Sequence, residues 1–385
     1  MNKKGTSMWR TVLALGVSAL FLSGCASHPK PELSDLPDVD DHVELEVVWR
    51  RQVGDGADGD YLRLAPAVTD DAVFAVDAAG LLMKVDRANG KVLWKEKTQL
   101  ALNGGVAADD EHVVIASTDG DVQVRDTESG ELIWSVNVGR EILSAPALSY
   151  GAVFIQTSDG RLYALDRKDG EQKWLFNAAV PVLTLRGSAS PKLSGPSVVA
   201  GFASGRIAVI RQEDGQVYYE RPVALPEGRS DLERMVDIDG DIWVEDQLAV
   251  LTSYQGELMV LQLANGKVIW SQPFSSTVGA VSGDGTVVAV DTDSHILGFS
   301  QYYQSEQWSN GSLIGRYLGS PAWLDGNVIV GDFGGYLHVL DGNSGELVGR
   351  KRVDWDPVTS RPIVVDSDII VQSNDGKIVL LRVKA

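Results

Sequence analysis

The residues best suited to catalysis or metal binding are the histidines and two acidic loops. The five histidines share no spacing that is typical of a metal site: His28, His42, His112, His295 and His338. The loop 237–241 begins like a calcium-binding EF-hand, but Ile242 stands where that motif requires glycine and Leu248 where it requires glutamate. The loop 54–60 is rich in glycine and aspartate without a ligand pattern. We therefore interpret both loops as solvated turns and expect no metal, no cofactor and no catalytic residue.

The single cysteine, Cys25, follows a short apolar leader. The apolar run 11–22 has twelve residues, which are too few to cross a bilayer core of about 30 Å. The segment Leu22–Cys25, with the sequence LSGC, resembles a bacterial lipobox, in which the leader is cleaved before the cysteine and the cysteine receives lipid. The resemblance implies a signal peptide over 1–24 and lipid attachment at Cys25, and the alternative is an ordinary secretory signal. Ala26 stands where an aspartate retains lipoproteins in the inner membrane, which implies the outer membrane.

The charge balance excludes nucleic acid as a partner. With 34 basic and 53 acidic residues the net charge is -19, and such a surface repels phosphate backbones. A single cysteine also excludes an intramolecular disulfide and a thiol redox pair. Residues 26–44 contain three prolines and six acidic residues, so we expect the segment 25–44 to be a flexible acidic tether.

Beyond this segment, a turn residue is followed fourteen residues later by an aromatic residue, in unit after unit. Six units show the pattern: Gly80 and Trp94, Gly120 and Trp134, Gly160 and Trp174, Gly205 and Tyr219, Gly256 and Trp270, Ser294 and Trp308. Gly335 and Gly349 keep the spacing without the aromatic ring. An eighth turn at Gly376 lacks its partner, whereas Trp49 lacks a turn glycine before it. These two incomplete halves complete one another, which gives eight units.

Each unit has the pattern of four short strands separated by turns, as in 67–68, 72–76, 81–85 and 91–95. Eight such units predict an all-β fold. We expect an eight-bladed β-propeller over 45–385, built from four-stranded antiparallel blades, because a ring of sheets protects the sheet edges. The strand around Trp49 is expected to close the ring by pairing with the three C-terminal strands, 361–365, 369–372 and 378–383.

The aromatic residues of the repeat are interpreted as structural, because large rings on outer strands cover the neighbouring blade. Stacking on carbohydrate is the alternative. The repeat, as in 165–174, resembles the quinoprotein type. That resemblance implies a dehydrogenase with pyrroloquinoline quinone and calcium in the central channel, which needs a catalytic base beside the metal. The chain offers no such residue, so we predict a non-enzymatic protein and keep the dehydrogenase as the alternative.

Two consecutive connections between blades are longer than the others. The step from the aromatic residue to the next turn glycine is 26 residues in two regular units, but 31 after Trp174 and 37 after Tyr219. Because successive blades are neighbours, we expect the enlarged loops to lie side by side, and long loops on a rigid scaffold are where function concentrates. The loops contain 181–187 and 226–240, and a capping box at 230–233 predicts a short helix in the second.

The first of these loops carries Leu183, Leu185 and Arg186. Aliphatic anchors beside a guanidinium suit a protein interface, where they provide affinity and orientation. The residues alone leave open a second interpretation, in which the two leucines begin an inner strand and face the core.

The lipobox, the acidic tether, the eight repeats and the Leu-x-Leu-Arg-Gly loop together resemble the BamB family of outer membrane protein assembly factors, over essentially the whole chain. The resemblance implies a non-enzymatic scaffold lipoprotein of the β-barrel assembly machinery that faces the periplasm. Its implied partner is the set of periplasmic polypeptide-transport-associated domains of the barrel-inserting subunit. The residues carried over are the anchors Leu183, Leu185 and Arg186, and the acidic partners Asp237 and Asp239 in the adjacent loop. Unfolded outer-membrane proteins are a further candidate partner, through strand addition, and a lipoprotein that binds polysaccharide or another envelope partner is the remaining alternative.

Overall fold

The structure is a computed structural model that describes residues 31–39, 42–59, 62–185, 187 and 189–384. The chain divides into two units, Met1–Pro31 and Glu32–Ala385, and all strands of the described residues lie in the second. The predicted signal peptide 1–24, the lipid-attachment residue Cys25 and Arg186 lie outside the described residues. Within the described ranges the chain forms strands and turns only, so no helix there is long and apolar enough to cross a membrane.

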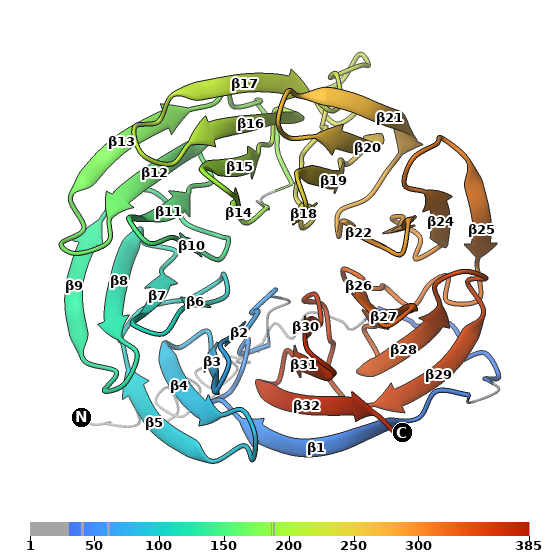
Figure 1. Cartoon of the computed structure of the whole chain (residues 1–385), viewed down its shortest axis with the longest axis horizontal. Helices are drawn as coiled ribbons and strands as arrows, with labels where there is room; N and C mark the ends of the chain where they lie inside the picture. Colours follow the sequence, from blue (N-terminus) through green and yellow to red (C-terminus); the bar gives the residue numbers. More distant parts are fainter. Residues whose placement is uncertain (1–30, 40–41, 60–61, 186, 188, 385) are drawn as a thin grey trace, which may run out of the picture. The chain divides into compact units, whose positions relative to one another are not determined.

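The second unit is a ring of eight four-stranded sheets (Figure 1), which confirms the predicted eight-bladed propeller. Blade 1 contains β2 (Ala67–Val68), β3 (Ala72–Val76), β4 (Leu81–Asp86) and β5 (Val92–Lys97). Blade 2 contains β6 (Ala107–Ala108), β7 (His112–Ala116), β8 (Asp121–Asp126) and β9 (Leu132–Asn137). Blade 3 contains β10 (Ala147–Leu148), β11 (Ala152–Gln156), β12 (Arg161–Asp166) and β13 (Gln172–Asn177). Blade 4 contains β14 (Lys192–Ser194), β15 (Ser197–Gly201), β16 (Arg206–Arg211) and β17 (Val217–Pro222).

The remaining blades follow the same order from the channel outward. Blade 5 contains β18 (Trp243–Glu245), β19 (Leu248–Thr252), β20 (Gly256–Gln262) and β21 (Lys267–Phe274). Blade 6 contains β22 (Ala280–Gly283), β23 (Thr286–Val290), β24 (Ile296–Ser300) and β25 (Glu306–Asn310). Blade 7 contains β26 (Ala322–Leu324), β27 (Asn327–Gly331), β28 (Tyr336–Asp341) and β29 (Leu347–Arg352). Blade 8 contains β30 (Ile363–Val365), β31 (Asp368–Gln372), β32 (Lys377–Val383) and, as its outer strand, β1 (Leu45–Gln52).

The first strand of the chain closes the ring. β1 pairs antiparallel with β32, from Leu45 opposite Val383 to Gln52 opposite Lys377. Figure 1 shows the first and last strands side by side at the rim. The predicted closure is therefore confirmed, with the ends of the C-terminal strands shifted by at most two residues.

The core lies between the blades. The five residues of β3 and of β11 are all buried, because each sheet is covered on both faces by its neighbours. The outer strand β5 instead alternates between half-buried and exposed positions. Apolar residues thus fill most of β3 and β11, whereas β5 ends in three charged residues, 95–97.

The aromatic residues of the repeat lock neighbouring blades together. The indole Nε1 of Trp134 donates a hydrogen bond of 2.9 Å to the carbonyl of Arg167 in the next blade. A Cβ on Gly170 would lie 2.7 Å from the same ring, so this turn needs glycine both for its positive φ and for the close approach. Seven seams carry the equivalent hydrogen bond, from Trp49, Trp94, Trp134, Trp174, Tyr219, Trp270 and Trp308.

The seam between blades 7 and 8 is different, because Gly349 stands in place of the ring. A Cβ on Gly349 would lie 2.2 Å from the carbonyl oxygen of Val43. The backbone N–H groups of His42 and Val43 both donate to the carbonyl of Val348, at 2.8 and 2.9 Å. The segment 25–44 that the sequence predicts to be flexible is thus held on blade 7 in its described C-terminal part, where Arg350 also donates to the carbonyl of Pro37 at 2.9 Å.

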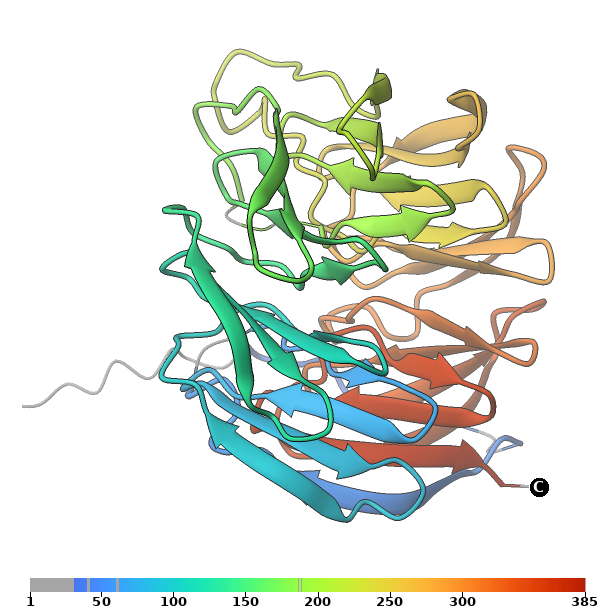
Figure 2. The same ribbon diagram turned by 60° about the vertical axis from the view of Figure 1, so that its left-hand side comes forward.

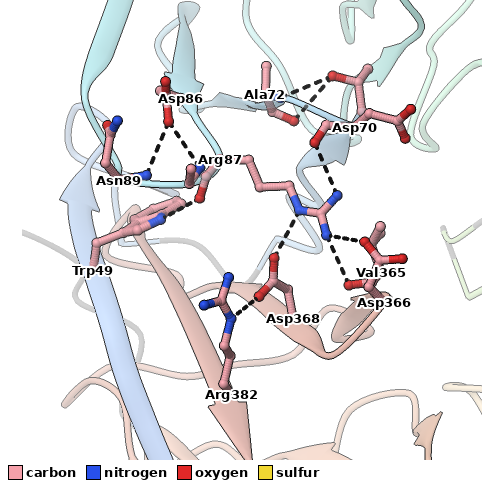
Figure 3. Close-up of polar contacts among 12 residues, drawn as sticks. Trp49, Asp70, Ala72, Asp86, Arg87, Asn89, Val365, Asp366, Asp368 and Arg382 are labelled. Carbon is pink, nitrogen blue, oxygen red and sulfur yellow. Dashed lines mark hydrogen bonds and ion pairs between the residues drawn. The ribbon is translucent and has the colours of Figure 1, made fainter.

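The seam between blades 8 and 1 adds an ionic cluster to its aromatic lock (Figure 3). The guanidinium of Arg87, which follows β4, binds Asp366 at 2.7 Å and Asp368 at 3.0 Å in the last blade. Asp368 also binds Arg382, and Trp49 of β1 donates to the carbonyl of Arg87. Burial opposes the charge of Arg87, but the two carboxylates outweigh it and raise the pKa of the guanidinium. The closing seam is held by charge as well as by strand pairing.

Candidate partner-binding loops

The first long loop connects β13 to β14 and presents apolar side chains to solvent. Val182 is 90% exposed and Leu183 is 39% exposed, whereas Leu185 is half-buried. Because β14 begins only at Lys192, the interpretation that the two leucines begin an inner strand is wrong. Leu183 is therefore available at the surface, while Leu185 lies deeper.

The second long loop connects β17 to β18, and its capping box forms without a helix. Ser230 N–H donates to Glu233 Oε2 at 3.1 Å, and Glu233 N–H donates back to Ser230 Oγ at 3.3 Å. The chain makes only a turn over 231–234, so the prediction of a short helix is wrong. These local hydrogen bonds satisfy the backbone donors of a single turn. The residues from 235 onward are buried toward the central channel and do not continue a helix.

The two loops meet around a hollow of about 280 Å³. Its walls come from both loops and one turn of blade 4: Ala179, Val180, Pro181, Val182, Leu183, Ser204, Pro226, Asp231 and Arg234. Leu225 and Leu232 of the second loop are 65% and 63% exposed. These two leucines were not among the predicted site residues, although their place in a polar, enlarged loop is a signal that could have identified them. Figure 2 shows the long connections of blades 4 and 5 projecting together beyond the blades.

The two aspartates of the second loop are buried, which corrects the interpretation of 237–241 as a solvated turn. Asp237 is 0% exposed and Asp239 is 6% exposed. The backbone N–H of Leu185 donates to Asp237 Oδ1 at 3.1 Å, which joins the first loop to the second. A Cβ on Gly187 would lie 2.7 Å from Asp239 Cγ, so the loops also touch there. Asp237 and Asp239 thus lie beneath the first loop.

Burial shapes the electrostatics of this loop. Burial, reinforced by the charge of Asp237, raises the pKa of Asp239 to about 7 against the attraction of Arg63. Asp241, two residues on, is also subject to desolvation, but Lys192, Arg361 and Arg63 outweigh it and lower the pKa of Asp241. The pKa values of the two aspartates shift in opposite directions because three cations act on Asp241, whereas Asp239 has only Arg63 to offset its burial and the charge of Asp237.

The C-terminal end of the second loop is held by two arginines that come from the other side of the central channel. Arg63, from the connection between blades 8 and 1, donates to the carbonyl of Asp239 at 3.3 Å. Arg361, from the connection between blades 7 and 8, donates to the carbonyl of Asp241 at 3.3 Å. These residues line a polar cavity of about 400 Å³. Among the described residues, no group of three or more His, Cys, Asp or Glu side chains is placed to hold a metal ion.

These features define the class of protein: an eight-bladed β-propeller whose ring carries two adjoining loops with exposed apolar side chains. The comparisons with known proteins are specific. Residues 78–310 match the family model of the outer membrane protein assembly factor BamB. The BamB protein of Pseudomonas aeruginosa is 45% identical over 378 residues, which cover 98% of this chain and 99% of that protein.

Solved structures agree in fold. The crystal structure of BamB from Moraxella catarrhalis superimposes with a TM-score of 0.81 at 24% identity and covers 88% of this chain and all of that one. A quinohemoprotein alcohol dehydrogenase from Pseudomonas putida gives a TM-score of 0.70 at 12% identity, covering 88% of this chain and 76% of that one. At this identity the likeness to the dehydrogenase shows a shared propeller fold and nothing about its chemistry.

The chain belongs to the BamB family of outer membrane protein assembly factors. It is therefore a non-enzymatic factor with a role in outer membrane protein assembly, and the alternative of a quinone-dependent dehydrogenase is set aside. The positions Leu183, Leu185, Asp237 and Asp239 come together where the two loops meet.

Proposed function

We propose that this chain is a scaffold lipoprotein that is attached through Cys25 to the periplasmic face of the outer membrane. Its two long loops bind the periplasmic polypeptide-transport-associated domains of the barrel-inserting subunit and orient them while β-barrel proteins are inserted. The observation that carries the proposal is the contact between the loops: Leu185 N–H donates to the buried Asp237, and Leu183 lies at the edge of the hollow that both loops line. A preformed apolar hollow with a half-exposed leucine suits an anchoring contact.

The five predicted residues have two different roles in this proposal. Leu183 contacts the partner, and Arg186 directs it by charge. Asp237 and Asp239 are positioning residues, because their side chains are buried beneath the first loop and hold it in place. Leu185 joins the two groups, because its backbone binds Asp237 while its half-buried side chain faces the channel cavity.

Co-purification of the barrel-inserting subunit tests the loops. We expect Leu183→Glu and Arg186→Glu to abolish capture of the subunit. Leu183→Glu places a charge where the partner must be desolvated, and Arg186→Glu reverses the charge that directs the partner. Tyr150→Glu is the matched control, because Tyr150 is 94% exposed in the β10–β11 turn, away from both loops. All three variants should unfold within about 0.5 kcal/mol of wild type. Retention of the subunit by both folded loop variants would overturn the proposed site.

Fractionation of cells tests the anchor separately. Several acyl chains at about 0.8 kcal/mol per buried methylene hold a protein on a membrane. We expect the wild-type protein to carry labelled palmitate and to sediment with outer membranes, and Cys25→Ser to remain unlabelled and unprocessed. A labelled, membrane-bound Cys25→Ser variant would show that the lipid lies elsewhere.

A further inference from the structure

The segment that leads from Cys25 is seated at one defined place on the ring. Ser34 N–H donates to the carbonyl of Gly315 at 3.3 Å, and Ser34 Oγ donates to the carbonyl of Ile314 at 2.7 Å. The guanidinium of Arg316 donates to the carbonyl of Ser34 at 2.8 Å and is itself held by the fully buried Asp332 at 2.6 Å. A buried ion pair thus fixes where the chain leaves the propeller.

The chain from this seat to the anchor is short. Eight residues carry the chain from Cys25 to Leu33, and eight extended residues span at most about 28 Å. If Cys25 bears lipid, as proposed above, the seat cannot lie farther than this from the headgroup layer. The surface beside Ser34 is therefore within reach of the membrane.

An aromatic surface lies beside the seat, and we call it the aromatic patch: Ile314, Tyr317, Phe333, Arg352 and Trp355. Trp355 is 75% exposed, Tyr317 is 49% exposed and Ile314 is 47% exposed. The rings of Tyr317 and Phe333 are 6.0 Å apart, edge to face. The Arg352 guanidinium lies 3.7 Å from the centre of the Trp355 ring. Leu33 reaches into this surface, since its side chain lies 3.3 Å from the position of a Cβ on Gly334.

The backbone contributes to this exposure. Tyr317 has a φ of 52°, a left-handed conformation that bulky residues rarely adopt. Strain of this kind persists where the surroundings impose it, and it occurs preferentially at binding surfaces. Here it accompanies a tyrosine ring that remains half exposed beside Phe333 instead of being packed into the blade.

The chemistry of the aromatic patch matches a phospholipid interface. Tryptophan and tyrosine concentrate at the headgroup level of membranes because one side of each ring system is apolar and the other is polar. A guanidinium binds phosphate oxygens with its fork of donors. Two acidic residues border the patch: Asp293, whose carbonyl accepts from Gly315 N–H, and Asp356, next to Trp355. Ring burial, and not net charge, must therefore supply most of the attraction.

We propose that the aromatic patch docks onto the phospholipid headgroup layer, so that blades 6 and 7 rest on the membrane that holds the lipid anchor. The patch lies on connections from the outer strand of one blade to the inner strand of the next, and on a turn between middle strands. The two long loops of blades 4 and 5 are connections of the same kind, so they emerge at the same face but in another sector of the ring. The partner-binding loops then stay accessible near the membrane. The inference rests on the proposed anchor at Cys25.

Site-directed labelling of the full-length lipoprotein in vesicles tests the proposal. Because Cys25 is acylated, Ile314→Cys introduces the only free thiol, which is labelled with an environment-sensitive fluorophore. In vesicles of phosphatidylethanolamine and phosphatidylglycerol, we expect a lipid-borne nitroxide to quench this label at least threefold more than a label at Tyr150→Cys, the control, whereas aqueous iodide quenches it less. Equal quenching of both labels by the nitroxide would overturn the proposal.

A second variant shows whether the patch itself makes the contact. Adding Trp355→Ser and Arg352→Gln to Ile314→Cys should reduce nitroxide quenching to the control level while the protein stays on the vesicles through its lipid. If quenching persists, the tether alone brings the label to the lipid and the patch proposal fails. If vesicles leave the label exposed but the barrel-inserting subunit protects it from iodide, the patch binds protein and the proposal also fails. Wild-type protein that does not remain on vesicles would instead refute the anchor.

Discussion

Buried polar atoms are paired at the outer wall of the ring, which is formed by the outer strands and the seams between them, but some are left unpaired on the channel side of the second long loop. At seven seams an aromatic N–H or O–H donates to a carbonyl of the next blade. On the channel side, Asp237 Oδ2 and Asp239 Oδ1 are buried without a hydrogen-bond partner among the described residues. Unpaired buried groups cost stability. The ring therefore gains stability at its wall and gives some of it up where the loops are positioned.

The largest expected effect breaks the wall at its closing seam. Arg87→Met removes one of the two cationic partners of Asp368, whose side chain is 5% exposed, and leaves it with Arg382 alone. The free energy of unfolding should fall by about 3 kcal/mol, the lower end of the range for breaking a buried ion pair. Arg167→Met is the matched control at the seam between blades 2 and 3. There the carboxylates of Asp109 and Glu111 are 38% and 72% exposed, so water replaces the arginine and the loss should stay below about 2 kcal/mol. Equal losses in urea unfolding would contradict a special role for the closing seam.

The second expected effect is a gain in stability, on replacement of Asp239. Because the pKa of Asp239 is raised to about 7 in the folded protein, its folded state holds a proton that its unfolded state releases between about pH 4 and pH 7. Stability should fall as pH rises through that window and level off above it. Asp239→Asn should remove this fall and raise the free energy of unfolding at pH 8 by on the order of 2 kcal/mol. Urea unfolding at pH 5 and pH 8 measures both, and a variant that is less stable at pH 8 would refute the contrast.

The smallest effect removes a single hydrogen bond from the wall. Trp94→Phe keeps most of the ring but loses the donor to the carbonyl of Thr127, at 3.1 Å. We expect thermal and urea unfolding to report a loss of about 1–2 kcal/mol. Trp355→Phe serves as the control and should change stability by less than about 0.5 kcal/mol, because Trp355 is mostly exposed. A larger loss from Trp355→Phe than from Trp94→Phe would contradict the seam interpretation.

The wall could be predicted because its signal is periodic. The fourteen-residue spacing from turn to ring gives the number of blades and their order, since one contact recurs at seven of the eight seams. Even the exception is visible in the sequence, as Gly349. Its cause is not visible, because the carbonyl of Val43 occupies the space of the ring only once the chain has closed on itself.

The channel side could be located but not described from the sequence. The count of residues between repeats places both long loops correctly. Extra loop residues lengthen the step from one repeat to the next but leave the fourteen-residue spacing within each repeat unchanged. The acidic run around Asp237 has the composition of a solvated turn, and only the fold shows it packed beneath the first loop. The capping box at Ser230 and Glu233 is likewise correct locally, but tertiary packing decides that no helix follows it.

Because β1 pairs with β32, the ring can close only after nearly the whole chain has been synthesised. Among the described strands, β1, which completes the last blade, is synthesised first, and its partner β32 is synthesised last. Until β32 has been synthesised, the edge of β1 stays unpaired, and chaperones or other strands can bind it. Closure joins strands that are far apart in the sequence, so we expect it to be the slow step of folding.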